Sequence, residues 1–263
     1  MDVVNESNGT EDAMLGTLSV EDWIKIETIK SSFVFMCKSS IPQCTEYVDC
    51  SDRISALITW SEFNNKIAMH FIKFIREINE FQELLIDDRL ILIKYNLLPV
   101  FSLGKCFNYR HGNDCCSHEP CEEGNRHRRI FTIFDDPNSM HDVMANLIQS
   151  LVATTQQNPT LLSLLVIILI LSPGLSMNED EPPLNDSLAV NRVQSYYTEL
   201  LWNYLVNEFG EIEACRRFTQ LMRPILQLQS LSRMSRTFFR DQYRGINAVD
   251  RIAPLMQSFL HIF

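Results

Sequence analysis

Apolar residues recur every three or four positions along much of the chain, the spacing that places them on one face of an α-helix. The clearest example predicts a helix from about Ile54 to Ile78. From Trp60 to its end this helix would be roughly 28 Å long, enough to cross a small domain. Its apolar face comprises Trp60, Phe63, Ile67, Phe71, Phe74 and Ile78.

After a tight corner, a second helix is predicted from Asp88 to about Leu103. Its residues are apolar on most sides, which is typical of a helix at the centre of a protein. Asp87 and Asp88 are good N-cap residues for this helix. Pro99 is expected to kink it, because proline lacks a backbone donor and clashes with the preceding turn.

Helices also dominate the rest of the pattern. Ser19 is predicted to cap a helix from Val20, and Asp22 fits a capping box, although its side chain is shorter than the preferred Glu. Pro224 is expected to bend or divide the last long helix. The other predicted helices are 139 to about 153, 160–171, 188–209, 211 to about 243, and a short closing segment, 253–263.

Three stretches lack this helical period. Residues 37–52 and the acidic stretch 176–187 are predicted loops, and residues 104–126 are polar and rich in turn signals. The segment RRIFTIFDD, 128–136, alternates over a few positions and is compatible with a short strand.

Composition narrows the class of protein. The chain has 263 residues, of which 46% are hydrophobic and 21% charged, so one domain or at most two can bury a sizeable core. Only eight residues are glycine, and no glycine-rich phosphate loop occurs. Few glycines and long helical periods predict an all-α protein.

Charge and hydropathy argue against nucleic-acid and membrane binding. The net charge of −10 gives no basic footprint, so no direct DNA contact is expected from this segment. The longest apolar run, 161–171, is too short to span a bilayer and is interpreted as a buried helix. Residues 1–17 are acidic, show no secretory signal and are predicted to be disordered.

Neither a metal nor an enzymatic site is predicted. Cysteines 106, 115, 116 and 121 lie near histidines 111, 118 and 127, which suggests zinc. They do not form two CxxC pairs, so a loop with incidental thiols is preferred. No nucleophile elbow or HExxH motif occurs. Glu122-Glu123 lie near two of these histidines, but in a polar stretch where solvated charges are the simpler reading. No cofactor is expected.

The stretch FIREINEFQELLIDDRLILIK, residues 74–94, resembles the signature of nuclear receptor ligand-binding domains. In that family an aromatic-small-Lys triplet is followed by a Phe and by Leu-x3-Asp-Gln-x-x-Leu-Leu-Lys. Later pieces fit the same order: the buried helix ending in Leu-Ser-Pro, and Cys215-Arg216-Arg217-Phe218 at the start of the long penultimate helix. The resemblance covers about residues 19–263, and 226–239 is similar to the thyroid and vitamin D receptor-like branch.

The resemblance implies a three-layer antiparallel sandwich of 11–12 helices with one small β-hairpin. The domain would span 18–263, with 104–127 as a turn-rich insertion. A small lipophilic ligand would lie under the long third helix. The implied ligand-binding residues are Leu57, Trp60, Phe63, Asn64, Ile67, Leu98, Phe101, Lys105, Ser235, Phe239 and, on the lid, Met256. Each could equally be core packing, because bulky Trp60, Phe63 and Phe101 could fill the space themselves.

The resemblance also implies a groove that binds coactivator or corepressor helices. Arg76 stands at the family's Lys position and Lys94 is the second basic residue. The last helix contributes Leu255, Met256, Phe259 and Leu260. Ser258 stands where the family has Glu, and a hydroxyl cannot make the charge-assisted bonds of a carboxylate. Weak coactivator recruitment, or a preference for corepressor, is therefore expected.

The implied function is that of a ligand-regulated transcription factor domain. The implied location is the nucleus, and shuttling to the cytoplasm is left open. The alternative is a ligand-independent scaffold or repressor with a filled pocket. Receptors that pair with the retinoid X receptor tend to have a Glu at the position of Pro99 and an Arg in the turn after the buried helix. This chain has Pro99 and, at 171–174, Leu-Ser-Pro-Gly, so both residues are missing. Both a homodimer and a retinoid X receptor-like heterodimer therefore remain open. No spacing supplies the family's two zinc fingers.

Overall fold

The computed structural model describes residues 18–40, 49, 51–109, 131–134, 140–244 and 249–261. All regular structure in these ranges is helical, which confirms the all-α prediction. The helices are α1 (Val20–Ser40), α2 (Arg53–Arg76), α3 (Asn79–Gln82), α4 (Ile86–Asn108), α6 (Met140–Thr155), α7 (Pro159–Ile170), α8 (Ser187–Phe209), α9 (Glu211–Arg244), the 3-10 turn η1 (Val249–Arg251) and α10 (Pro254–Leu260).

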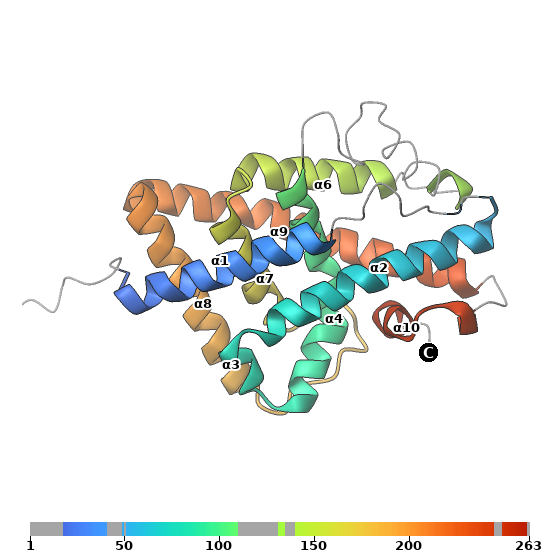
Figure 1. The fold of residues 1–263 in the computed structure, drawn as a ribbon, viewed down its shortest axis with the longest axis horizontal. Helices are drawn as coiled ribbons and strands as arrows, with labels where there is room; N and C mark the ends of the chain where they lie inside the picture. Colours follow the sequence, from blue (N-terminus) through green and yellow to red (C-terminus); the bar gives the residue numbers. More distant parts are fainter. Residues whose placement is uncertain are drawn as a thin grey trace, which may run out of the picture.

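The helices form a layered sandwich (Figure 1). Helices α1 and α2 pack against each other on one side, and α6 and α9 pack against each other on the other. Helices α4 and α7 pack together between them, and α8 joins α7 to α9. The short α10 contacts α2, α4 and α9 near the C-terminal end of the described chain.

Local capping explains several helix ends. Ser19 and Asp22 form the predicted capping box: Ser19 N donates to Asp22 Oδ2 at 3.1 Å, and Asp22 N donates to Ser19 Oγ at 3.0 Å. The shorter Asp therefore reaches as a Glu would. Asn158 Oδ1 accepts from Leu161 N at 3.0 Å and starts α7. Gly210, with φ of 74°, ends α8.

The prediction that Asp87 and Asp88 cap the second helix is wrong. Leu85 precedes the first residue of α4, and both acids lie within its first turn. Asp88 is 1% exposed, and its carboxylate accepts from the backbone amides of Asn185 at 2.7 Å and Asp186 at 2.9 Å. It therefore fixes the start of α8, far along the chain, rather than the start of its own helix.

Helix α4 continues through Pro99 to Asn108, five residues beyond its expected end at about Leu103. Gly104, interpreted as a turn signal, lies inside this helix. A Cβ atom on Gly104 would come within 3.1 Å of Phe71 Cζ, so glycine allows α4 to approach α2 closely. The first residues of the expected insertion 104–127 are thus helical, and residues 110–127 lie outside the described residues. Helix α9 likewise continues through Pro224.

The short strand expected at 128–136 is not found in its described part, because residues 131–133 form a helical turn. Phe131 and Phe134 are both buried, whereas Thr132 is exposed. This i, i+3 spacing puts both rings on one side of a turn of helix, which a strand cannot do. The family's small hairpin does not occur among the described residues, and residues 1–17, predicted to be disordered, lie outside them.

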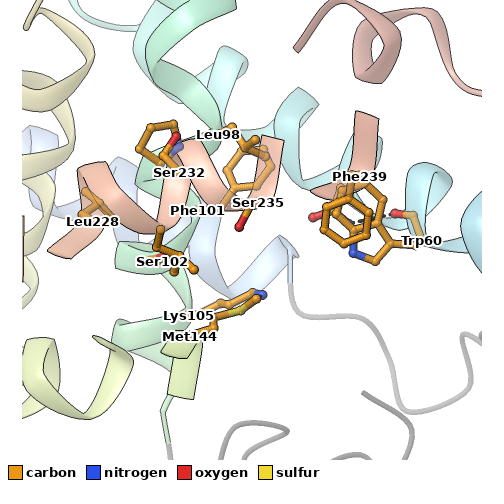
Figure 2. Close-up of a pocket in the computed structure, with 13 residues that line it drawn as sticks. Trp60, Leu98, Phe101, Ser102, Lys105, Met144, Leu228, Ser232, Ser235 and Phe239 are labelled. Atoms are coloured by element: carbon orange, nitrogen blue, oxygen red, sulfur yellow. Dashed lines mark hydrogen bonds between the residues drawn. The ribbon is translucent and has the colours of Figure 1, made fainter. Parts of the chain in front are cut away.

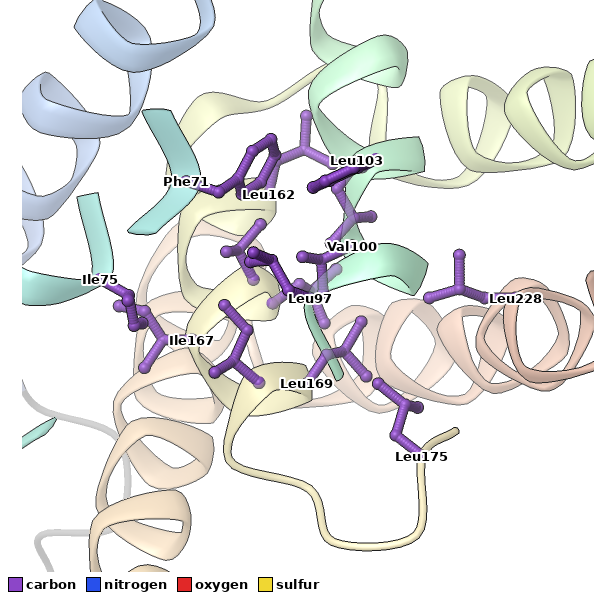
Figure 3. Close-up of a cluster of buried hydrophobic side chains, with 14 of the residues drawn as sticks. Phe71, Ile75, Leu97, Val100, Leu103, Leu162, Ile167, Leu169, Leu175 and Leu228 are labelled. Carbon is purple, nitrogen blue, oxygen red and sulfur yellow. The ribbon is translucent and has the colours of Figure 1, made fainter. Parts of the chain in front are cut away.

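The core is centred on α4 and α7 (Figure 3). Leu97, Val100 and Leu103 of α4 meet Leu162 and Ile167 of α7, all at most 1% exposed. Helix α4 is the one described helix long and apolar enough to cross a membrane, but 61% of its apolar window is buried inside the protein. Contacts with neighbouring helices therefore account for most of its apolar surface.

Candidate ligand cavity and helix-binding surface

A small cavity lies between α2, α4, α6 and α9 (Figure 2). Its volume is about 60 Å³. Ligand pockets for drug-sized molecules hold roughly 300–1,000 Å³, and one water occupies about 30 Å³ in the liquid. The cavity as it stands can therefore hold one or two waters and no lipophilic ligand.

Seven of the eleven predicted ligand-binding residues line this cavity: Trp60, Asn64, Leu98, Phe101, Lys105, Ser235 and Phe239. Six lining residues were not predicted: Pro99, Ser102, Met144, Leu228, Leu231 and Ser232. Pro99 and Ser102 lie inside the predicted second helix, each next to a predicted lining residue, Leu98 or Phe101. The contributions of α6 and the middle of α9 had no signal in the sequence.

The other four predicted residues lie outside the cavity lining. Leu57, Ile67 and Met256 are buried in the core, and Phe63 packs partly buried against it. The Leu57 carbonyl accepts a hydrogen bond from the Tyr243 hydroxyl at 2.8 Å, which joins α2 to α9.

Aromatic side chains pack closely at one end of the cavity. The rings of Trp60 and Phe239 stack with centroids 3.6 Å apart and planes at 18° (Figure 2). Phe239 also contacts Phe131, Phe134 and Phe238, with centroids 6.2, 6.1 and 5.1 Å away. This cluster holds the Phe239 ring in place, so the stack cannot separate without moving several neighbours.

Polar groups at the cavity are few. Asn64 Nδ2 donates to the Trp60 carbonyl at 2.8 Å. Lys105 Nζ lies 3.4 Å from Met144 Sδ, and the two side chains run side by side in Figure 2. Ser232 Oγ is buried and has no hydrogen-bond partner among the described residues. A ligand or water in this cavity would meet one cation, one amide and hydroxyl groups.

Helix α10 is docked on the domain through its apolar residues. Met256, Phe259 and Leu260 are at most 1% exposed, whereas Leu255 and Ser258 are half-buried at the edge. Ala253 N donates to Ser61 Oγ at 3.3 Å, which ties the start of α10 to α2. Burial of three large side chains holds this seven-residue helix against α2, α4 and α9, and we call the docked helix α10 the lid helix.

Basic and apolar side chains of α2 and α4 form a candidate surface for helix binding. Arg76 is exposed at the end of α2. Its carbonyl accepts from Gln82 Nε2 at 3.0 Å, and Gln82 Oε1 accepts from Arg89 Nη1 at 2.5 Å, so α3 joins the end of α2 to the start of α4. Lys94 Nζ lies 5.5 Å from the Tyr95 ring centroid.

Apolar side chains on α2 and α4 extend this surface. They fall at helical spacing: Met69 and Ile72 on α2, and Ile86, Leu90 and Ile93 on α4. Met69, Ile86 and Leu90 are 55, 64 and 60% exposed. Ile72 and Ile93 are partly buried and also pack against the core. We call these five residues, with Arg76 and Lys94, the α2–α4 surface.

The cysteine- and histidine-rich stretch contributes little to the described structure. Cys106 is buried, with its Sγ 3.6 Å from Thr155 Oγ1, and the other three cysteines and the three histidines of the zinc hypothesis lie outside the described residues. Within those residues no group of three His, Cys, Asp or Glu side chains is placed to hold a metal ion.

Comparisons with known proteins agree with the fold. The family model for the ligand-binding domain of nuclear hormone receptors matches residues 57–240, well over half of the chain. A search of curated proteins found no match. Domains of this family are regulators rather than enzymes, act in the nucleus, and typically work with lipophilic ligands, coregulators and dimer partners. The chain belongs to the nuclear hormone receptors, and residues 57–240 fall in the family's ligand-binding domain.

Proposed function

We propose that this domain regulates transcription by binding coregulator helices in a conformation that needs no ligand. The observation that carries the proposal is the Trp60–Phe239 stack, at a centroid distance of 3.6 Å, in a cavity of about 60 Å³. In this state the protein's own aromatic side chains take the place of a lipophilic ligand. The lid helix α10 is docked over a core that is already filled.

The α2–α4 surface is the proposed docking site. An amphipathic helix binds through apolar residues at i, i+3 and i+4, which match the exposed stripes of α2 and α4. Arg76 can donate to the unpaired carbonyls at the C-terminal end of such a helix. At the α10 side, Ser258 offers a hydroxyl in place of a carboxylate, so only one end of the bound helix gains a charged partner.

Fluorescence polarisation with a labelled LxxLL helix tests this proposal on the ligand-free protein. Arg76→Glu should weaken binding at least tenfold. Lys73→Glu is the matched control, because Lys73 is exposed in the same helical turn but points toward the Phe35 ring of α1. Ser258→Glu should strengthen binding, since a carboxylate there can accept from the amides at the N-terminal end of the peptide helix.

Equal effects of Arg76→Glu and Lys73→Glu would contradict the proposed docking site, as would full binding in the double variant Leu90→Asp, Ile72→Asp. Ser258→Ala should leave binding unchanged, because the hydroxyl contributes little.

A ligand sensor is the second candidate. The observation in its favour is the set of polar groups on an otherwise apolar lining, with Asn64, Lys105 and Ser232 placed to hold a polar end. The sensor function requires the Trp60 and Phe239 rings to separate. A lipid extract that raises both the melting temperature and peptide affinity of the purified protein would favour the sensor.

Dimerisation is proposed through α9, as either a homodimer or a retinoid X receptor-like heterodimer. Met222 and Leu226, one turn apart on α9, are 41 and 62% exposed. Most other apolar residues of this helix are directed into the core. The proposed location is the nucleus, with or without shuttling to the cytoplasm.

A further inference from the structure

Arg236 on α9 is a buried arginine, only 5% exposed, near the C-terminal end of the lid helix α10. Its guanidinium donates to three backbone carbonyls. Nε reaches Phe259 O of α10 at 3.1 Å, Nη2 reaches Tyr95 O of α4 at 3.2 Å, and Nη1 reaches Ser176 O of the α7–α8 loop at 3.3 Å. One side chain thus ties the lid to two other parts of the domain.

Two of these carbonyls have no helical donor. In an α-helix the carbonyl of residue 95 would accept from the amide of residue 99. Residue 99 is proline and has no N–H, so Tyr95 O would be a buried, unpaired acceptor without Arg236. Phe259 lies in the last turn of α10, where carbonyls also lack intrahelical donors.

The charge of Arg236 suits this position. Burial lowers the pKa of Arg236 to about 10, so the side chain remains protonated at neutral pH. A cation at the C-terminal end of a helix is stabilised by the helix dipole. Helix α10 has only seven residues, too few to be stable alone in water, so its position depends on such tertiary contacts.

The loop that supplies the third carbonyl is itself fixed. Glu181 accepts from Gly174 N and from Ser176 Oγ, both at 3.0 Å, and Tyr95 OH donates to the Asp180 carbonyl at 2.9 Å. Arg236 therefore binds the lid to a rigid frame and not to a mobile partner.

We infer that Arg236 is the positioning residue that keeps α10 docked on the domain. The three carbonyls select an arginine, because a lysine presents its donors at a single point. Any effect of Arg236 on coregulator binding rests on the proposed function. Its role in the docking of α10 does not depend on that proposal.

Hydrogen exchange of the α10 amides on the whole chain tests this role. In Arg236→Met, which keeps most of the volume and removes the donors, the amides of residues 257–260 should exchange at least tenfold faster. The amides of the buried helix α7 should be unchanged. Arg233→Gln, an exposed arginine one turn earlier on α9, is the control and should leave both helices unchanged.

Unchanged exchange in α10 would overturn the inference, and so would equal acceleration in α10 and α7. If Arg236→Met does not fold, the same exchange experiment is done on Arg236→Lys. Unchanged exchange in α10, or equal acceleration in α10 and α7, would overturn the inference there too. Failure of both variants to fold also overturns it, because Arg236 would then serve overall stability. Peptide binding, measured on the same variants, is the separate readout: a peptide that still binds when α10 is released contradicts the proposed function and leaves the docking role intact.

Discussion

Asp88 shows how a single residue can have a role that its local sequence does not reveal. An Asp at the start of a helix is normally assigned to that helix as a cap. Here its carboxylate accepts from Asn185 and Asp186, ninety-seven and ninety-eight residues away. A local capping rule could not identify these donors, because they approach only when the chain is folded.

Replacing Asp88 with alanine should lower the free energy of unfolding by about 1–2 kcal/mol, because the backbone amides of Asn185 and Asp186 lose their acceptor. The loss is limited because Asn185 is exposed, so its amide can bind water instead. Urea denaturation measures the change. Asp87→Ala is the matched control: Asp87 is exposed in the same turn, and its removal should cost less than about 1 kcal/mol. Equal losses in the two variants would show that Asp88 acts only through the dipole of α4.

His261, just after α10, makes docking of the lid sensitive to pH. Its ring lies against the Tyr95 ring, with centroids 4.6 Å apart and planes tilted by 40°. Burial, together with Arg236 and Arg240 of α9 and Lys94 of α4, lowers the pKa of His261 to about 4. Since the docked state favours neutral imidazole, its contribution is complete above about pH 6.5 and is lost as the pH falls toward 4.

Hydrogen-exchange protection factors of α10 should therefore decrease between pH 6.5 and 4. His261→Phe keeps the ring and removes the titration, so its protection should change less over this range. Identical pH profiles for the two proteins would show that another group controls docking at low pH.

At the scale of helices, hydrophobic spacing predicted most of the architecture. The long helix of 54–78, the buried helix of 160–171 and the helix ended by Gly210 are all found within a few residues of their predicted bounds. The errors have physical causes. Gly104 is a close-packing residue against Phe71 and not a turn, and Phe131 with Phe134 fit a helical turn better than a strand.

The interior prolines have consequences that the local sequence does not reveal. Pro99 lies inside a continuous α4 and leaves the Tyr95 carbonyl without its helical donor, and Arg236 donates to that carbonyl. The two residues lie 137 positions apart in sequence, so no local pattern connects them.

Pro99 and Arg236 should therefore be energetically coupled. In a double-mutant cycle, Arg236→Met should cost less in the Pro99→Ala background, because the new amide of residue 99 can donate to Tyr95 O. The expected coupling is on the order of 1 kcal/mol of unfolding free energy, the value of one buried hydrogen bond. Strictly additive losses would mean that the Tyr95 carbonyl does not depend on Arg236.

At the scale of the whole molecule, the family resemblance identified most residues around the cavity but did not predict how small the cavity is. Seven of the predicted residues line it, but the sequence could not show that Trp60 and Phe239 stack and reduce it to about 60 Å³. Side-chain volume alone does not decide whether a ring lines a space or fills it. That depends on the neighbouring helices α6 and α9, which meet α4 only in the fold.

The small cavity and the docked lid support the proposal of a ligand-independent regulator over that of a ligand sensor. In the first, aromatic packing and Arg236 stabilise the same arrangement of α10 that a ligand would otherwise favour. In the second, a ligand must supply differential binding energy to shift the lid. The two differ in one measurable property, which is whether the folded, functional protein carries a small molecule.

Native mass spectrometry of the purified protein, with its peptide-binding activity checked on the same sample, measures this property most directly. The ligand-independent regulator predicts the mass of the bare polypeptide, and the same sample should bind the LxxLL helix. A stoichiometric lipophilic molecule, released on denaturation and required for peptide binding, would contradict it.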